Sequence, residues 1–431
     1  MSGFYERLTI KRSACPKNCH ACVDVCISRD PDNDSIPVIR IIDGLKNDYN
    51  DTLTCFQCNQ PACMDICPSG AINKSDIDGI VRIDQFKCAG CSLCTLGCSY
   101  GQAYFDQRLN KAFKCDLCDG KPQCVDACPY GVLSFAKSGI VYDAVKEDIL
   151  PQGTSLCPGC GGDLALRHML RVLGNEDLLT FGCPGCLIDL GSAHAPNIYG
   201  PMTTVPSMMS GASRYFRKIG KKATLLAFVG DGCASDIGFQ PLSAAAHRNE
   251  NIIFVCYDNE AYQNTGAQSS STTPYGAWTM TTQVGAQGTG KEQSSKYMPL
   301  IMAMHFPKYV ATISLAYLED YTKKILKAKE AVKNGFVYLH ILSPCPTGWK
   351  SNSNSTITLS QLAVETNYFP LWEAEEGNFK LTYKTENRKP IMEFTNHQGR
   401  FAHLTEQQID KLQDLVDNRF KYIEKLSEIR L

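Results

Sequence analysis

The chain has 431 residues, 44% of them hydrophobic, which is enough for two or three domains with packed cores. Its formal net charge of −1 at pH 7 excludes the strongly basic field of a protein that binds nucleic acid or an anionic membrane surface. No stretch approaches the ~20 apolar residues of a membrane span, and the opening residues MSGFYERLTI contain no apolar signal core. Because many cysteines without an export signal suit a reducing compartment, we expect a cytoplasmic protein, with chemistry suited to anaerobic conditions.

Cysteines are concentrated at the start of the chain, where 16 of the 23 fall into four groups of four. The third group reads CAGCSLC followed by TLGC, a spacing with which a chain wraps a 4Fe–4S cluster. Four such groups predict four clusters, and the fourth cysteine of a group usually ligates the partner cluster of a pair. The groups are Cys15, Cys19, Cys22 and Cys26; Cys55, Cys58, Cys63 and Cys67; Cys88, Cys91, Cys94 and Cys98; and Cys115, Cys118, Cys124 and Cys128.

Structural zinc and disulfides are the two alternatives to clusters for these cysteines. Structural zinc would suit isolated Cys-x2-Cys pairs, but zinc sites rarely repeat the full spacing of the third group. Disulfides would suit an extracellular chain, and nothing in the sequence marks this chain as secreted. The pattern therefore favours clusters in a cysteine-rich α+β domain over residues 1–140, with short strand-like pieces such as IPVIRII at 36–42 and GIVRID at 79–84.

After a junction at 142–160 the sequence becomes typical of an α/β domain, which we place at 150–431. The apolar runs 224–230 and 252–258 predict buried parallel strands, and the stretch 237–249 between them predicts a helix, which gives a βαβ unit. A second such unit is expected from the strand 309–316, the charged helix 319–334 ended by Gly335, and the strand 336–342. Further expected elements are a helix at 164–173, a hairpin around NFKLTY at 378–383, and a C-terminal helix that starts at Thr405, with Gln408 completing a capping box.

A cofactor motif follows the first predicted strand of this domain. The strand leads into Gly230-Asp231-Gly232, and Asn259 follows the next strand, 28 positions after the aspartate. Because parallel strands deliver their carboxyl ends to one edge of a sheet, Asp231 and Asn259 should converge there, with the carbonyl oxygen of Ala261. These oxygens suit Mg²⁺, which completes its octahedron with phosphate and water. This spacing is typical of thiamine diphosphate sites, and the predicted cofactor-binding residues are Gly230, Asp231, Gly232, Asn259, Ala261, Thr265 and Gly266.

Residues 150–431 resemble the β subunits of the 2-oxoacid:ferredoxin oxidoreductases, most closely the pyruvate and 2-oxoisovalerate branch. The resemblance rests on CPGCG at 157–161, on the segment from GDGCASDIGF to AYQNTG, on SPCPTGW at 343–349, and on LAVETNYFPLWEAEEGNFKLTYK and HQGRF near the end. It implies a further 4Fe–4S cluster near the cofactor, held by Cys157, Cys160, Cys183 and Cys345. Cys186 competes with Cys183, but the family cysteine directly follows a glycine, which favours Cys183.

Two positions depart from that family. Tyr199 stands where the family often has a histidine, and Cys233 follows the GDG motif where glycine or aspartate is usual. His194 lies nearby and could contact phosphate or substrate, although an ordinary surface or core histidine is the simpler interpretation. Cys233 and Cys256 are interpreted as buried thiols without a ligand role.

Residues 1–140 resemble the four-cluster subunits of molybdopterin reductases and formate hydrogenlyase-type complexes. That resemblance implies that the first and fourth cysteine groups share one cluster pair and that the second and third share the other. The chain departs from the pattern in a Cys15–Cys19 spacing that is one residue longer and in a third group that lacks its proline. With the cluster near the cofactor, the expected total is five.

Together the two resemblances imply a subunit of a 2-oxoacid:acceptor oxidoreductase. It would convert a pyruvate-like 2-oxoacid and coenzyme A to acyl-CoA and CO2, and its clusters would carry the electrons away. No catalytic residue is assigned in this chain, because the family's activating glutamate lies on the pyrimidine-binding domain of a partner α subunit. A γ subunit is expected as well, with ferredoxin or a flavoprotein subunit as electron acceptor. Two alternatives stay open here, namely an aryl 2-oxoacid such as phenylglyoxylate as substrate and a non-catalytic electron-transfer subunit.

Overall fold

The computed structural model describes residues 6–10, 15–16, 18–27, 37–43, 50–58, 61–98, 100–137, 148–151, 154–174, 176–187, 193–286, 288–385 and 388–429. The chain forms two compact units, Met1–Glu147 and Asp148–Leu431, and each is described by itself. Of the predicted junction at 142–160, residues 142–147 and 152–153 lie outside the described part.

The first unit is built from short hairpins and single-turn helices that carry the cysteines. Strands β1 and β8 pair antiparallel and tie its two ends together, while β2–β3, β4–β5 and β6–β7 form three further antiparallel hairpins. Helix α1 packs against α4, and α2 packs against α3. The strands are β1 Glu6–Ile10, β2 Arg40–Asp43, β3 Asn50–Leu53, β4 Ile72–Lys74, β5 Val81–Ile83, β6 Tyr104–Asp106, β7 Lys111–Phe113 and β8 Leu133–Lys137; the helices are α1 Ala21–Ile27, α2 Ala62–Asp65, α3 Leu93–Gly97 and α4 Gln123–Asp126, with a 3₁₀ turn η2 at Leu117–Gly120.

The second unit is organised around an eight-stranded sheet with the order β10-β9-β11-β12-β16-β15-β17-β18. The first six strands are parallel, and β17 and β18 add an antiparallel hairpin at one edge. The strands are β9 Leu178–Gly182, β10 Asn197–Tyr199, β11 Thr224–Gly230, β12 Ile253–Asp258, β15 Tyr309–Ile313, β16 Val337–Leu342, β17 Trp372–Glu375 and β18 Asn378–Leu381. A separate small hairpin joins β13 Val284–Gly285 to β14 Gly288–Thr289.

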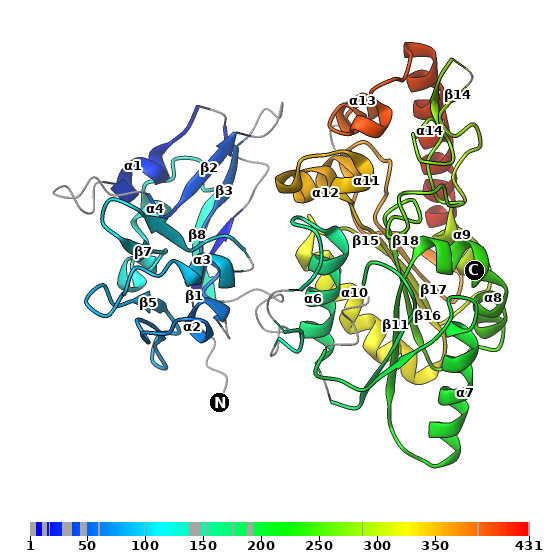
Figure 1. The fold of residues 1–431 in the computed structure, drawn as a ribbon, viewed down its shortest axis with the longest axis horizontal. Coiled ribbons are helices and arrows are strands. Elements are labelled where there is room, and N and C mark those ends of the chain that lie inside the picture. Colours follow the sequence, from blue (N-terminus) through cyan, green and yellow to red (C-terminus); the bar gives the residue numbers. More distant parts are fainter. Residues whose placement is uncertain are drawn as a thin grey trace. The chain divides into compact units, whose positions relative to one another are not determined.

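Helices cover both faces of this sheet. Figure 1 shows α6 and α10 on one side and α7, α8 and α9 on the other. The helices are α6 Gly161–Leu173, α7 Val205–Lys218, α8 Phe239–His247, α9 Met298–Ala303, α10 Leu318–Ala331, α11 Pro346–Trp349, α12 Thr356–Glu365, α13 Ile391–Thr395 and α14 Glu406–Glu428; a π-helical turn η4 spans Gly232–Ile237, and 3₁₀ turns are η5 Val332–Asn334, η6 Ser353–Ser355 and η7 Gly399–Phe401. The arrangement is the expected α/β fold with both faces of a mostly parallel sheet covered.

Both predicted βαβ units are present. β11 and β12 pair in parallel around α8, and β15 and β16 pair in parallel around α10. The strand predicted at 309–316 is shorter, because the chain turns at Ser314, whose carbonyl oxygen accepts a hydrogen bond from the Tyr317 N–H. The strands β9 and β10 were not predicted, since each is short and β10 is largely exposed.

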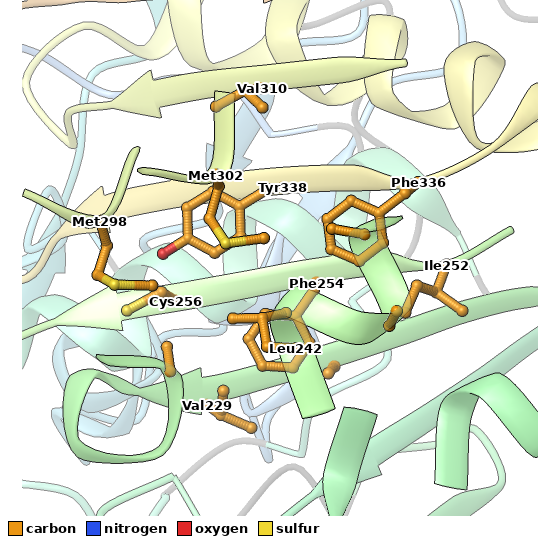
Figure 2. Close-up of a cluster of buried hydrophobic side chains, with 14 of the residues drawn as sticks. Val229, Leu242, Ile252, Phe254, Cys256, Met298, Met302, Val310, Phe336 and Tyr338 are labelled. Carbon is orange, nitrogen blue, oxygen red and sulfur yellow. The ribbon is translucent and has the colours of Figure 1, made fainter. Parts of the chain in front are cut away.

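The core behind the strand ends is packed against the face that carries α8 and α9. Figure 2 shows Val229, Phe254, Cys256 and Tyr338 pointing from neighbouring strands toward Leu242 of α8 and toward the two methionines Met298 and Met302 of α9. All of these side chains are fully or almost fully buried. Burial of each large apolar side chain stabilises the fold by ~1.5–3 kcal/mol, so this layer fixes the carboxyl ends of β11 and β12.

The C-terminal helix begins as predicted. Thr405 is the N-cap of α14, its hydroxyl accepts a hydrogen bond from the Gln408 N–H at 3.3 Å, and the Gln408 side chain accepts one from the Thr405 N–H at 3.0 Å. This reciprocal pair satisfies backbone donors that the first helical turn would otherwise leave open. The hairpin predicted around NFKLTY is also confirmed, as β17 and β18.

We expect Thr405→Ala to destabilise the first turn of α14 by about 1 kcal/mol, because the substitution removes the capping acceptor. Hydrogen exchange followed by mass spectrometry should show faster exchange in the first turn of α14 and unchanged exchange in α10. Thr405→Ser keeps the acceptor and is the matched control. Equal protection in the alanine and serine variants would contradict a stabilising role for the cap.

Candidate functional site

The predicted metal ligands lie together because two neighbouring strands end at the same edge. β11 and β12 are parallel and paired in register up to Gly230 opposite Tyr257, so Asp231 and Asn259 leave the sheet side by side. Asp231 is 1% exposed and Asn259 is 8% exposed. The shared strand ending therefore brings a carboxylate and an amide to one buried point, as the sequence predicted.

The distances at this point fit a small divalent cation. The Asn259 amide group lies 3.0 Å from Asp231 Oδ1 and 2.8 Å from the carbonyl oxygen of Ala261 when its nitrogen faces them. When the amide oxygen of Asn259 faces Asp231 Oδ1 and the Ala261 carbonyl oxygen instead, three oxygens surround one point, with the same 3.0 Å and 2.8 Å separations. Oxygens in adjacent corners of a Mg²⁺ octahedron, ~2.1 Å from the ion, lie ~3.0 Å apart, so the residues present fit this metal.

A buried polar network lies behind Asp231. The Thr272 hydroxyl lies 3.1 Å from Asp231 Oδ2 and 2.8 Å from Asp258 Oδ1. Asp258 Oδ2 lies 3.0 Å from His340 Nε2, and the other ring nitrogen of His340 lies 2.9 Å from the Tyr338 hydroxyl. These contacts hold Asp231 in one orientation, with Oδ1 left free to face the Asn259 amide.

The charge at Asp231 is costly without a cation. Burial, followed by the nearby negative charge of Asp258, raises the pKa of the Asp231 carboxyl well above its usual range. A divalent ion at Oδ1 would reverse that penalty, because it stabilises the ionised carboxylate. The electrostatics therefore favour a bound cation as strongly as the distances do.

Tyr262, in the loop that follows β12, lines the cleft that contains Asp231. Its hydroxyl donates to Asp236 Oδ2 at 3.1 Å and to the carbonyl oxygen of Gly232 at 3.3 Å. A Cβ atom on Gly232 would collide with the Tyr262 ring, so glycine is required there for packing. Of the seven predicted cofactor-binding residues, six line one cleft with Tyr262 and Cys186. Gly266 does not line it and is exposed, with a φ of 110°.

A second group of cysteines lies beside the cleft. Burial, together with the nearby thiols of Cys345, Cys160 and Cys157 and the Asp231 carboxylate, raises the pKa of Cys186 to about 12. Burial, followed by the nearby thiol of Cys345, also raises the pKa of Cys160. Three of the four cysteines carried over from the resemblance are therefore brought together, but the fourth member of the group is Cys186.

Cys183 does not join this group. It directly follows β9 and is 7% exposed within the hydrophobic core, where its thiol contacts that of Cys233. Cys186 comes after the Pro184-Gly185 turn and so reaches the open edge of the sheet. The structure therefore favours Cys186, because a position directly after a strand keeps the Cys183 side chain in the sheet core. Which of the two cysteines binds a cluster stays a prediction.

Local backbone holds the new cysteine group. Cys345 is the N-cap of α11 and its sulfur accepts the Gly348 N–H at 3.3 Å, while the Thr347 hydroxyl lies 3.8 Å from the Cys157 sulfur. The Gly161 N–H donates to the carbonyl oxygen of Pro344 at 3.0 Å, which joins the two cysteine loops. A Cβ atom on Gly161 would lie 2.8 Å from the Pro344 nitrogen, so this close approach requires glycine.

The sixteen cysteines of the first unit lie in four sets, and in each set three come from one group and the fourth from another. The members of each set are the thiols that act on the pKa of one buried cysteine, namely Cys22, Cys124, Cys63 or Cys94. The Cys124 thiol is also influenced by Cys22, because their two sets are neighbours. The sets are Cys15, Cys19, Cys22 and Cys128; Cys26, Cys115, Cys118 and Cys124; Cys55, Cys58, Cys63 and Cys98; and Cys67, Cys88, Cys91 and Cys94.

Backbone N–H groups point at several of these sulfurs. The donors to Cys98 and Cys128 are Gln102 N at 3.2 Å and Val132 N at 3.3 Å, each four residues after the cysteine. Although burial opposes it, such backbone bonds lower the pKa of Cys128 below its usual value. N–H···S bonds stabilise thiolates and tune a cluster that they hold. No three His, Cys, Asp or Glu side chains of the described residues lie close enough for a single metal ion, so the cluster assignment rests on spacing and family.

The remaining candidate residues have structural roles or lie at the surface. His194 is exposed, as its simpler interpretation expected, and Tyr199 is 48% exposed. Cys233 and Cys256 are fully buried thiols, and Cys233 donates to the Met202 carbonyl oxygen at 3.1 Å. The sequence analysis missed Thr272 and His340, because their contacts with the metal site depend on segments far from it in the chain.

Comparison with known proteins identifies both units. The family model "4Fe-4S dicluster domain" matches residues 48–138, and "Thiamine pyrophosphate enzyme, C-terminal TPP binding domain" matches residues 186–341. NADH-dependent phenylglyoxylate dehydrogenase subunit beta of Aromatoleum evansii is 38% identical over 443 residues, covering 99% of each chain. Pyruvate synthase subunit PorB of Methanothermobacter marburgensis is 42% identical over 280 residues, covering 63% of this chain and 96% of its own.

Similarity extends to other 2-oxoacid enzymes. Ketoisovalerate oxidoreductase subunit VorB of Pyrococcus abyssi is 36% identical over 293 residues, covering 64% of this chain and 93% of its own. A solved 2-oxoglutarate:ferredoxin oxidoreductase from Magnetococcus marinus is 20% identical, with a TM-score of 0.40, and covers 51% of this chain and 79% of its own.

The fold and the matched models define a thiamine diphosphate-binding, iron–sulfur oxidoreductase. The chain belongs to the family of β subunits of the 2-oxoacid oxidoreductases, and it is an enzyme subunit of a hetero-oligomer. Within the described residues, no helix combines the length and apolarity that a membrane span requires.

We expect Cys186→Ala to lose one 4Fe–4S cluster, about four irons per chain, because it removes a thiolate that lies with Cys157, Cys160 and Cys345. Cys183→Ala is the matched control and should keep full iron content. Anaerobic iron analysis and electron paramagnetic resonance (EPR) spectra of the purified complex measure both. Iron loss in the Cys183 variant with wild-type iron in the Cys186 variant would reverse the assignment.

Proposed function

We propose that this subunit binds thiamine diphosphate and Mg²⁺ and catalyses, with a partner α subunit, the coenzyme A-dependent oxidative decarboxylation of a pyruvate-like 2-oxoacid. The 2-oxoacid and coenzyme A give acyl-CoA, CO2, one proton and two electrons. When bound, thiamine diphosphate supplies the carbon nucleophile and the electron sink that cleavage of the carbon–carboxylate bond requires. The electrons then leave through the clusters.

One observation carries this proposal: Cys186 and the metal-site residues line the same cleft. Cys186 is close enough to Asp231 for the carboxylate to influence its thiol. A cluster held by Cys157, Cys160, Cys186 and Cys345 would therefore adjoin the diphosphate site. This proximity supports direct electron transfer from the cofactor, which a subunit that only relays electrons would not need.

The chain's own residues bind and orient the cofactor. Asp231, Asn259 and the Ala261 carbonyl oxygen would hold Mg²⁺ and, through it, the diphosphate. Thr272 and Asp258 fix the orientation of Asp231. The activating glutamate belongs to the pyrimidine-binding domain of the α subunit, which would cover the exposed loop at Asn264 and Thr265.

The four cysteine sets of the first unit support four further clusters, which makes five. We assign electron transfer to residues 1–140 and thiamine diphosphate binding to 150–431. Two sets are adjacent when each contains a cysteine from the other's sequence group, which joins the Cys15 set to the Cys26 set and the Cys55 set to the Cys67 set. Cys115 of the Cys26 set lies near Cys55. The four proposed clusters therefore follow one another in the order Cys15, Cys26, Cys55 and Cys67 set. A γ subunit would complete the complex, and ferredoxin or a flavoprotein subunit would accept the electrons.

We expect Asp231→Ala to weaken thiamine diphosphate binding in the presence of Mg²⁺ by more than ~100-fold. Loss of a residue that only contacts a metal ligand costs up to about that factor. The reason for the larger effect is the loss of the only carboxylate among the three proposed metal ligands. Isothermal titration of the cofactor-depleted complex measures the affinity, and iron analysis should show unchanged clusters.

Asp414→Ala, on the exposed side of α14, is the control and should bind the cofactor with wild-type affinity. Wild-type affinity in the Asp231 variant would refute the metal site.

The function itself is tested by assaying the anaerobically purified complex with pyruvate, 2-oxoisovalerate and phenylglyoxylate, with and without coenzyme A. Phenylglyoxylate is included because the relative that aligns over both units is named for it. We expect reduction of a viologen dye that requires coenzyme A and an aliphatic 2-oxoacid, with acyl-CoA as product. Activity with phenylglyoxylate alone would overturn the proposed substrate, and no activity with any 2-oxoacid would overturn the proposed catalysis.

A further inference from the structure

The two cluster pairs of the first unit meet at a buried glutamine. Gln57 lies between Cys55 and Cys58, is 1% exposed, and has a φ of 48°, in the left-handed region. Its side-chain nitrogen donates to the Cys115 carbonyl oxygen at 2.7 Å, and its side-chain oxygen accepts the Val81 N–H at 2.8 Å. The side chain therefore bridges the Cys55 set and the set that contains Cys115.

A buried lysine lies at the same junction. Lys114 is 8% exposed, and its ammonium donates to the carbonyl oxygens of Val81 and of Cys115, the latter at 2.8 Å. The side-chain oxygen of Gln57 is a third, longer contact at 3.5 Å.

The acceptors around Lys114 carry no charge. In the part of the chain that the structure describes, no carboxylate lies within ion-pair distance of this ammonium. A buried cation without a counter-charge is costly, so negative charge must come from elsewhere nearby. The clusters proposed on either side are the nearest sources, because Lys114 contacts the carbonyl oxygen of Cys115 and the side chain of Gln57, which lies between Cys55 and Cys58.

We propose that Lys114, positioned by Gln57, is a counter-cation shared by the two central clusters and raises the reduction potential of both. The inference rests on the four-cluster assignment above. Each cluster gains one negative charge when it accepts an electron released by oxidation of the 2-oxoacid. A fixed positive charge in a buried site stabilises this reduced form. Because Lys114 raises both potentials, it favours electron transfer from a terminal cluster into the two central ones.

The test is a potentiometric titration of the full complex with dithionite, followed by EPR. In Lys114→Met, which keeps the length and removes the charge, we expect two of the cluster signals to shift to more negative midpoint potentials. Lys121→Met is the matched control, because this exposed lysine follows Cys118 closely but is screened by solvent. Its potentials should match the wild type.

Gln57→Glu is a second variant that keeps the lysine. It places a carboxylate beside the ammonium and cancels its charge, so the same two signals should shift in the same direction. If the Lys114→Met complex loses iron, the potentials of the Gln57→Glu complex alone test whether Lys114 raises them.

Wild-type potentials in a Gln57→Glu complex with full iron content would overturn the inference. The titration needs no 2-oxoacid, so that result leaves the proposed function intact. A chain that carries no iron would overturn both.

Discussion

The structure depends on the parallel pairing of β11 with β12. Their register places Gly230 opposite Tyr257, so Asp231 and Asn259 emerge together at the carboxyl edge of the sheet. The buried layer of Phe254, Cys256 and Tyr338 against α8 and α9 fixes that edge from behind (Figure 2). A one-residue slip would turn every side chain of a strand to the opposite face, so the packed core and the metal site require the same register.

The cluster-binding parts follow a different constraint, which is the distribution of charge. Backbone N–H groups point at cysteine sulfurs, as at Gly348 and Val132, and a lysine side chain lies at the junction of the two pairs of cysteine sets. These hydrogen-bond donors and cations stabilise the cysteine loops, as apolar packing stabilises the sheet. In the proposed clusters, the same residues would also influence how readily each cluster accepts an electron.

Much of the second unit's fold could be predicted from the sequence, because the patterns that predict it are local. The unbroken apolar runs predicted both βαβ units, Thr405 and Gln408 predicted the start of α14, and the GDG spacing predicted that Asp231 and Asn259 lie together. Cys186 could not be separated from Cys183 by spacing alone, since the choice depends on where β9 ends. Thr272, His340 and Lys114 are brought to their sites by tertiary packing, which no local pattern encodes.

The central claim is that one subunit passes electrons from a cofactor-bound 2-oxoacid into its own clusters. The most direct measurement is a rapid anaerobic mixing of the loaded complex with a single 2-oxoacid, without external acceptor, followed by freeze-quench EPR. The account predicts that signals of reduced clusters appear with the 2-oxoacid alone and increase when coenzyme A is added. Clusters that dithionite reduces but that no 2-oxoacid reduces in a cofactor-loaded complex would contradict it.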